Sequence, residues 1–303
     1  MKTDLTVKLG KLILKNPVMV ASGTFGYAQE FEDFMNLKKL GAVVTKTITI
    51  KPRKGNLPPR TCETPAGMLN SIGLENPGLE EFLAEKIPYL ASLGIPVIVS
   101  IASETNPDEF IFLASKLDKI NCVRGLELNI SCPNMQEHQL ISQDPRATFK
   151  VVSSVRKATK KIIITKLSPN VTCITDIAIA AQDAGSDALA LINTLTVISI
   201  DIHTRKSRLG AGIGGLSGPA IRPVALRKVW ETYQKVKIPI IGMGGIIDAA
   251  SAIEFFIAGA SAISVGTANF IDPDISVKII AGLERYLLEQ KIGKINSLIG
   301  SLR

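Results

Sequence analysis

One thiol stands between two amides in the segment Asn129-Ile130-Ser131-Cys132-Pro133-Asn134. The segment follows an apolar run, Gly125–Leu128, that we interpret as a buried strand. In a barrel of parallel strands, residues that leave the C-terminal ends of the strands lie on the face where active sites are assembled. Cys132 is therefore the first candidate for a catalytic group. The amides of Asn129 and Asn134 both donate and accept, which suits a flat heterocycle with alternating C=O and N–H groups.

Two lysines lie inside apolar runs, Lys46 in VVTKT and Lys166 in IITKL. Burying an unpaired ammonium is costly, although a lysine at a strand end can extend its charge to solvent. Two lysines at strand ends on one face favour cations that meet anionic ligands. Asn70, in a long loop, and Asn193, at a strand end, add two more amides.

Glycine-rich segments end the last two strand-like runs. They are Gly242-Met243-Gly244-Gly245-Ile246 and Gly266-Thr267-Ala268, and a third, Gly214-Gly215-Leu216-Ser217-Gly218, lies in a long loop. Bare glycines let backbone N–H groups approach phosphate oxygens, and barrels commonly bind phosphate after strands seven and eight. The spacing predicts a phosphorylated ligand.

These residues are positioned by short, nearly continuous apolar runs that alternate with helix-like segments. Such runs are typical of parallel strands buried on both faces. The eight runs are Pro17–Ser22, Ala42–Ile48, Pro96–Ala102, Gly125–Ser131, Lys161–Ser168, Ala188–Thr194, Pro239–Gly245 and Ala262–Ala268. Eight runs predict an α/β fold of the (β/α)8 TIM barrel type.

The remaining segments predict additions to this barrel. Val7–Lys15, with Gly10 in its middle, predicts a β-hairpin that closes the barrel bottom. Two long connections, Thr49–Gly78 and Leu195–Pro223, leave the catalytic face, and loops of such length are usually functional.

Glycines also mark the ends of helix-like segments. Gly41, Gly185 and Gly259 each stand between such a segment and a strand, where we interpret them as helix C-caps. Asp248 is placed as the N-cap of the helix before Gly259.

The composition of 303 residues, 46% apolar and 20% charged, predicts one large domain that spans residues 1–303. No apolar stretch approaches the length of a membrane span and the N-terminus has no signal-peptide pattern, so we expect a cytoplasmic location. Four separated cysteines and two histidines argue against a zinc or iron–sulfur site. The net charge of +8 is spread along the chain, which favours solvated surface over nucleic-acid binding.

The chain resembles the class 1 dihydroorotate dehydrogenases, which are FMN-dependent barrels. The resemblance spans nearly the whole chain, in NPVMVASGTFG from Asn16, TPAGMLNSIGLENPG from Thr64, LELNISCPN from Leu126, KLSPN from Lys166, GGLSGPAIRPVALR from Gly214, IPIIGMGGI from Ile238 and GTANFIDP from Gly266. The cysteine in SCPN resembles the class 1 pattern, because the membrane-associated class 2 enzymes have serine at this position. The LSGPAI and GTANF segments resemble subclass 1B, the NAD-linked form.

The resemblance implies oxidation of (S)-dihydroorotate to orotate in pyrimidine (UMP) biosynthesis. Cys132 would take the proton from C5, while hydride leaves C6 for flavin N5. Ser131 would assist by hydrogen bonding, and Lys46 would lie near both flavin and substrate. Lys166 would place a positive charge beside flavin N1 and the C2 carbonyl, where it favours the reduced flavin.

The same resemblance implies two sets of binding residues. Those for the substrate are Lys46, Asn70, Ser71, Ile72, Gly73, Leu74, Asn129, Asn134, Asn193 and Thr194. Those for one FMN per chain are Ala21, Ser22, Lys46, Thr47, Asn129, Lys166, Ile192, Gly218, Gly244, Gly245, Gly266 and Thr267, of which the last four would hold the phosphate.

Two positions depart from the family pattern. The segment Met135-Gln136-Glu137-His138-Gln139-Leu140 replaces the glycine-containing lid that the family would have after the cysteine. Ser100 stands where many relatives have asparagine near the flavin, so we assign no flavin contact to that position.

Subclass 1B further implies a partner, an electron-transfer subunit that carries FAD and a [2Fe–2S] cluster and passes electrons to NAD. This chain lacks the closely spaced cysteines for such a cluster and a G-x-G-x-x-G segment for NAD. The family pattern is a catalytic homodimer within a heterotetramer, without nucleic-acid or membrane partners.

Other readings stay open at this point. A dihydropyrimidine dehydrogenase-like enzyme would share the barrel and the cysteine but use a neutral pyrimidine. A Schiff-base aldolase would use Lys166 as a nucleophile and bind no flavin. A dihydrouridine synthase would need an added RNA-binding domain, and a phosphate-binding barrel without catalysis would not depend on Cys132.

Overall fold

Eight parallel strands form the centre of the fold in a computed structural model, which describes residues 3–103, 106–131, 133–134 and 139–303. The strands are β3 (Val18–Val20), β4 (Val43–Val44), β7 (Val97–Ile101), β8 (Val123–Asn129), β11 (Ile162–Lys166), β12 (Ala188–Leu191), β17 (Ile240–Gly242) and β18 (Ala262–Val265). Their order is β3-β18-β17-β12-β11-β8-β7-β4, and a parallel bridge between Met19 and Ala42 closes the ring. The predicted (β/α)8 TIM barrel is confirmed, with a strand at each of the eight runs, although β8 begins at Val123, two residues before its predicted run.

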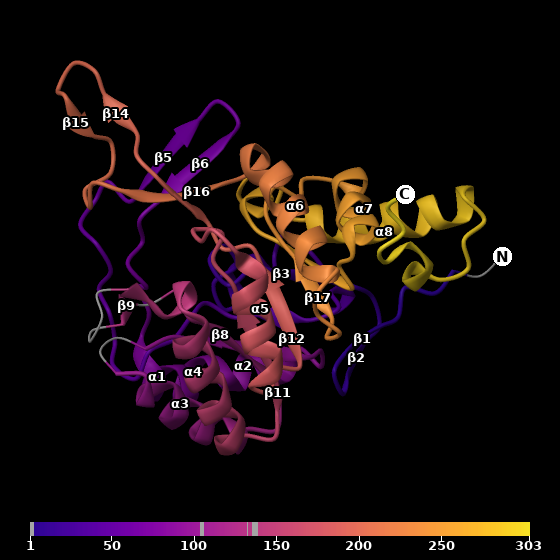
Figure 1. The fold of residues 1–303 in the computed structure, drawn as a ribbon, viewed down its shortest axis with the longest axis horizontal. Helices are drawn as coiled ribbons and strands as arrows, with labels where there is room; N and C mark the ends of the chain where they lie inside the picture. Colours follow the sequence, from indigo (N-terminus) through magenta and orange to yellow (C-terminus); the bar gives the residue numbers. More distant parts are fainter. Residues whose placement is uncertain (1–2, 104–105, 132, 135–138) are drawn as a thin grey trace.

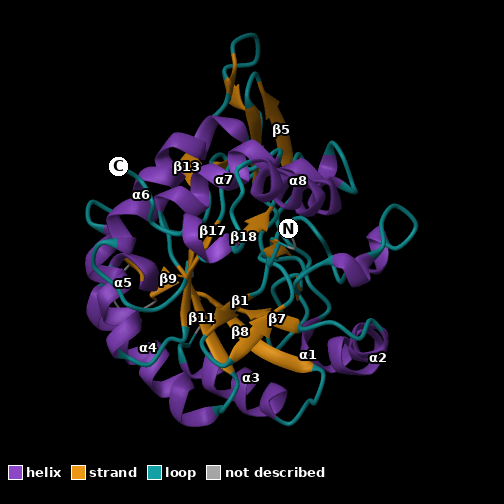
Figure 2. Ribbon diagram, turned by 90° about the vertical axis from the view of Figure 1, so that its right-hand side faces the viewer, coloured by secondary structure: helices purple, strands orange, loops and turns teal. Residues whose placement is uncertain are grey.

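Helices cover the outside of the strand ring (Figure 2). They are α1 (Gly78–Glu81), α2 (Ile87–Ser92), α3 (Asp108–Asp118), α4 (Pro145–Ala158), α5 (Ile174–Asp183), α6 (Arg222–Tyr233), α7 (Ala249–Ala258) and α8 (Ile275–Glu289), with a π-helical stretch, Phe82–Lys86, between α1 and α2. Short 3-10 helices lie at Gln29–Phe31, Leu37–Lys39, Ile141–Gln143, Pro219–Ile221, Thr267–Phe270 and Ile295–Leu298. Among the described residues, no helix is both long enough and apolar enough to cross a membrane.

The core lies between strands and helices because each helix buries one face. In α4 the buried residues are Thr148, Val151, Val152 and Val155, which recur at the spacing of one helical face. In β7 all five residues are buried, as expected for a strand covered on both sides. The fully apolar runs in the sequence therefore follow from double-sided burial.

The N-terminal hairpin pairs β1 (Val7–Leu9) with β2 (Leu12–Leu14) in antiparallel register, as predicted. Gly10 turns the chain at φ +56°, and a Cβ there would lie 2.9 Å from the Asp187 Cβ. Asp187 immediately precedes β12, so the hairpin meets the N-terminal end of that strand. The cavity described below lies at the opposite end of the barrel.

The helix caps follow the predicted pattern at three of the four positions. Asp248 caps α7 through a reciprocal capping box with Ser251. Gly259 (φ +119°) and Gly185 (φ +100°) end α7 and α5 in the left-handed region, where glycine is favoured. The prediction is wrong for Gly41, because its φ is not positive and a Cβ there would lie 2.2 Å from the Asn16 carbonyl oxygen. Close backbone approach, not capping, requires glycine at that position.

The two long loops pair with each other in a four-stranded antiparallel sheet. Its strands are β5 (Thr61–Thr64), β6 (Gly67–Asn70), β13 (Leu195–Val197) and β16 (Gly214–Ser217), in the order β13-β16-β6-β5. A further ribbon, β14 (Ile200–Asp201) with β15 (Lys206–Ser207), extends from the second loop, and both structures project from the barrel (Figure 1). A smaller ribbon pairs β9 (Pro133–Asn134) with β10 (Gln139–Leu140).

Candidate active site

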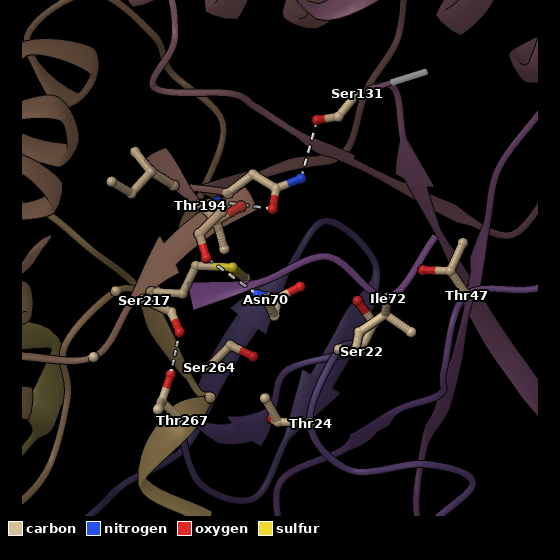
Figure 3. Close-up of a pocket in the computed structure, with 18 of the residues that line it drawn as sticks. Ser22, Thr24, Thr47, Asn70, Ile72, Ser131, Thr194, Ser217, Ser264 and Thr267 are labelled. Atoms are coloured by element: carbon tan, nitrogen blue, oxygen red, sulfur yellow. Dashed lines mark hydrogen bonds between the residues drawn. The ribbon is translucent and has the colours of Figure 1, made fainter. Parts of the chain in front are cut away.

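A cavity of about 770 Å³ opens where the barrel strands end at their C-terminal sides. Its walls come from the segments that follow the strands and from the sheet made by the two long loops (Figure 3). This volume lies in the range of about 300–1,000 Å³ that small-molecule sites occupy. The predicted active face therefore carries a cavity large enough for a ligand.

Nearly all of the residues singled out in the sequence line this cavity. Those that do are Ser22, Lys46, Thr47, Asn70, Ser71, Ile72, Gly73, Leu74, Asn129, Ser131, Lys166, Ile192, Asn193, Thr194, Gly218, Gly244, Gly245, Gly266 and Thr267. Ala21 is buried beside Gly266, since a Cβ added at Gly266 would lie 3.7 Å from the Ala21 Cβ. Ala21 does not itself line the cavity.

Two residues of the predicted site are not placed here. Cys132 lies outside the described residues, as does the segment 135–138 of the altered lid. Asn134 is described only as part of β9, which pairs with Gln139 of β10. The structure thus leaves the role of Cys132 as a prediction.

Lys166 ends β11 and is only 7% exposed, so its ammonium is held at the barrel interior. Its Nζ donates to the Ser22 hydroxyl at 3.4 Å. Ser22 follows β3, on the other side of the strand ring, and is itself 3% exposed. This is the one hydrogen bond of the Lys166 ammonium among the described residues. A single long bond satisfies a buried ammonium poorly, which favours an anionic or strongly accepting ligand beside Lys166.

Asn193 follows β12, and both the nitrogen and the oxygen of its side-chain amide form hydrogen bonds. Its Nδ2 donates to the Ser131 hydroxyl at 3.0 Å and to Asn129 Oδ1 at 3.4 Å. Its Oδ1 accepts from the Thr194 backbone N–H at 2.8 Å. These contacts join the ends of β8 and β12 and set the orientation of the side chain next to residue 132, as Figure 3 shows for the bond to Ser131.

The loop sheet delivers Asn70 to the same cavity. In the pairing of β6 with β16, Asn70 stands opposite Gly215, and its Nδ2 donates to the Gly215 carbonyl at 3.4 Å. A Cβ at Gly215 would lie 2.1 Å from the Thr194 hydroxyl oxygen. Glycine at 215 is therefore required for Asn70 and Thr194 to share one wall.

Glycines in unusual conformations form a further part of the cavity wall. Gly218, Gly244 and Gly245 all have positive φ, between +80° and +120°. A Cβ at Gly245 would lie 2.9 Å from the Gly218 carbonyl oxygen, so side chains are excluded where these two segments meet. The Thr267 hydroxyl donates to the Ser217 hydroxyl at 2.8 Å, joining the end of β18 to the second loop.

Several lining residues were not assigned to the site in the sequence, among them Ser264, Asn170 and Glu30. Ser264 in β18 has a buried hydroxyl oxygen without a hydrogen-bond partner among the described residues. Asn170 donates to the Thr194 carbonyl at 3.0 Å, and Glu30 lines the cavity from the segment after β3. Asn170 belongs to the KLSPN segment and could have been noticed there, whereas nothing in the local pattern marks Ser264 or Glu30.

Several known proteins are similar to this chain over nearly its whole length. A family model described as dihydroorotate dehydrogenase matches residues 4–287. The chain is 53% identical over 303 residues to dihydroorotate dehydrogenase B (NAD(+)), catalytic subunit, of Pelobacter propionicus, covering 100% of this chain and 99% of the relative. It is 52% identical to the protein of that name from Geotalea uraniireducens (99% of each chain) and 51% identical to that from Desulforudis audaxviator (99% and 98%). The chain therefore belongs to the dihydroorotate dehydrogenase family of oxidoreductases.

Proposed function

We propose that this chain is the FMN-binding catalytic subunit of an NAD-linked dihydroorotate dehydrogenase, with residues 1–303 as one catalytic domain. It would oxidise (S)-dihydroorotate to orotate in the de novo synthesis of UMP. The observation that carries the proposal is one cavity that joins Lys46 and Lys166, the amides of Asn70 and Asn193, and glycine-rich strand ends. Family membership supports the same reaction.

The cavity residues fit FMN. The Ser264 hydroxyl has no hydrogen-bond partner within the described part of the chain, so it can bond to a ligand, and such buried groups are costly unless satisfied. Gly244, Gly245 and Gly266 have no side chains, so the backbone after β17 and β18 is accessible from the cavity. This is the usual place for phosphate in barrels. Lys166 would lie beside N1 and the C2 carbonyl of the flavin ring. Bound FMN would supply the acceptor for the hydride from C6 of dihydroorotate.

The chain's own groups would hold the substrate and take its proton. Cys132 would remove the proton at C5, which requires its thiolate, because the thiol is the weaker base. Ser131 immediately precedes it, and its hydroxyl is held by Asn193. Asn70, Asn129, Asn134 and Thr194 would bind the ring and carboxylate, with Lys46 as the positive charge.

The electrons would leave through another protein. The relatives are named as catalytic subunits of an NAD(+)-linked enzyme, which supports a partner subunit for this chain as well. We propose that this partner carries FAD and a [2Fe–2S] cluster, and that two catalytic chains form the centre of a heterotetramer. NAD would then be reduced on the partner.

The visible spectrum of the purified chain under anaerobic conditions tests the proposal. A yellow protein that is bleached by dihydroorotate, but not by dihydrouracil, is the expected result. Bleaching by dihydrouracil alone would move the assignment to a neutral pyrimidine, and a colourless chain that cannot take up FMN would exclude the flavoenzyme. NAD reduction that appears only when the partner subunit is added would test the electron route separately.

A further inference from the structure

A buried carboxyl group lies in the barrel just below the cavity. Glu127 belongs to β8 and is 2% exposed. It stands two residues before Asn129, so the two side chains point to the same side of the strand. Neither substrate binding nor proton transfer, as proposed above, uses Glu127. A carboxyl group is seldom fully buried unless hydrogen bonds or nearby charges offset the free energy of its desolvation.

Hydrogen bonds connect Glu127 to the wall of the cavity. The Ser100 hydroxyl in β7 donates to Glu127 Oε1 at 2.9 Å. The same Ser100 oxygen lies 2.9 Å from the hydroxyl oxygen of Thr47, which follows β4 and lines the cavity. Ser100 is fully buried and Thr47 is 6% exposed, so water has little access to either bond. These hydrogen bonds thus join β8, β7 and the segment that follows β4, three neighbours in the barrel.

The direction of each hydrogen bond between Glu127, Ser100 and Thr47 follows from counting the available protons. An ionised Glu127 can only accept, and with Glu127 in that form the one proton of the Ser100 hydroxyl is used in the bond to Glu127. The bond between Ser100 and Thr47 must then be donated by Thr47. With its proton turned toward Ser100, the Thr47 hydroxyl has only acceptor lone pairs left for the cavity. Figure 3 shows the Thr47 oxygen on the side of its side chain that faces the cavity.

We propose that Glu127 and Ser100 are positioning residues that make the Thr47 hydroxyl a fixed hydrogen-bond acceptor for the cofactor. The inference rests on the proposed binding of FMN in this cavity. An acceptor of fixed direction selects ligand N–H groups and disfavours a carbonyl or phosphate oxygen at the same place, and the flavin ring carries such an N–H. The departure at position 100, serine in place of asparagine, therefore acts on the cofactor through Thr47, without a contact of its own.

The test is a double-mutant cycle on FMN affinity, measured by quenching of flavin fluorescence after FMN is removed from the purified chain. We expect Ser100→Ala and Thr47→Val each to weaken FMN binding roughly three- to tenfold, the effect of one net hydrogen bond. If Ser100 acts through the Thr47 hydroxyl, Ser100→Ala will cost no further affinity in the Thr47→Val background.

Thr47→Ser is the matched control, because it keeps the hydroxyl and removes only the methyl group. In the Thr47→Ser protein, Ser100→Ala should weaken FMN binding by roughly the same factor as it does in the wild-type protein. An equal loss in the Thr47→Val background would overturn the inference, since Ser100 would then act by packing alone. Wild-type protein that binds no FMN would instead refute the proposed function, so the two failures are distinguishable.

Thermal unfolding of each FMN-free variant shows whether it is folded. If Ser100→Ala does not fold, Ser100→Cys replaces it throughout the cycle, because a thiol matches serine in shape and is only a weak donor. A cycle with either variant that shows no coupling to the Thr47 hydroxyl counts against the inference.

Discussion

The Asn193 amide donates to the Ser131 hydroxyl at 3.0 Å, across the ends of two strands that are 62 residues apart in the chain. Ser131 precedes Cys132, so this bond fixes the backbone and side chain next to the proposed base. Because the Asn193 Oδ1 accepts from the Thr194 N–H and Nδ2 donates to Asn129 Oδ1, a flip of the amide would lose both of these contacts. The position of the Ser131 side chain, which precedes the proposed base, is therefore set from the end of β12 and not only from its own strand.

Replacing Asn193 by aspartate tests this relationship, because aspartate keeps the acceptor for Thr194 but places a carboxylate oxygen against Asn129 Oδ1 and reverses the direction of the bond to Ser131. We expect the rate of flavin bleaching by dihydroorotate to fall roughly 10- to 100-fold, since small losses of position are costly in catalysis. Stopped-flow absorbance of the anaerobic enzyme measures this rate, and FMN content should be unchanged. An aspartate variant as fast as the wild type would contradict the assigned role.

Cys132→Ser should slow flavin reduction by roughly 10²- to 10⁴-fold, the usual contribution of a general base. The rate should also continue to rise at higher pH than in the wild type, because a hydroxyl ionises far less readily than a thiol with a pKa of about 8.5. Single-turnover bleaching across a pH series measures both effects. Cys122→Ser is the control, because Cys122 precedes β8 at the other end of the strand; equal losses in both variants would argue against base catalysis by Cys132.

Lys166→Met should make the midpoint potential of bound FMN more negative, because a buried positive charge next to the ring favours added electrons. The expected change is on the order of 30 mV or more, about 1.4 kcal/mol for a two-electron couple. Equilibration with a reference dye measures it. Lys161→Met is the matched control, since Lys161 lies at the opposite end of the same strand and donates to the Ile120 carbonyl. An unchanged potential in Lys166→Met would place the lysine away from the flavin.

Asp248→Ala should lower the free energy of unfolding by about 1 kcal/mol at neutral pH through loss of the α7 cap. Burial alone would raise the pKa of Asp248, but the hydrogen bonds from Ser251 and the nearby charge of Arg222 outweigh it and hold the pKa below 3.8. A lowered pKa in the folded state means that the stabilisation is complete above 3.8 and is lost as the pH falls through the folded value. Urea unfolding between pH 3 and 7 should show the wild type and the alanine variant converging at the acidic end.

The matched variant Asp248→Asn keeps a capping side chain without a titrating group. Its stability relative to Asp248→Ala should stay nearly constant across the same pH range. A difference between aspartate and alanine that does not shrink on acidification would show that the cap does not depend on the ionised carboxyl group.

Local pattern was sufficient for the barrel and for much of the candidate site. The eight apolar runs each predicted a strand because burial on both faces leaves the same signal wherever such a strand occurs. Asp248 and Gly259 predicted the ends of α7 because capping depends on residues adjacent in the chain. Nearly all of the residues that the family resemblance assigned to the site line one cavity in the structure.

The contacts between distant segments were decided by the tertiary structure alone. Neither long loop has a pattern that predicts its pairing with the other, yet this sheet delivers Asn70 to Gly215 and Thr194. Gly41 was misassigned because the carbonyl that excludes a side chain there comes from Asn16, 25 positions earlier in the numbering. The hydrogen bonds from Glu127 through Ser100 to Thr47 join β8, β7 and the segment that follows β4. Strand register and loop packing set such distances, and sequence periodicity reports which face is buried but not what lies across it.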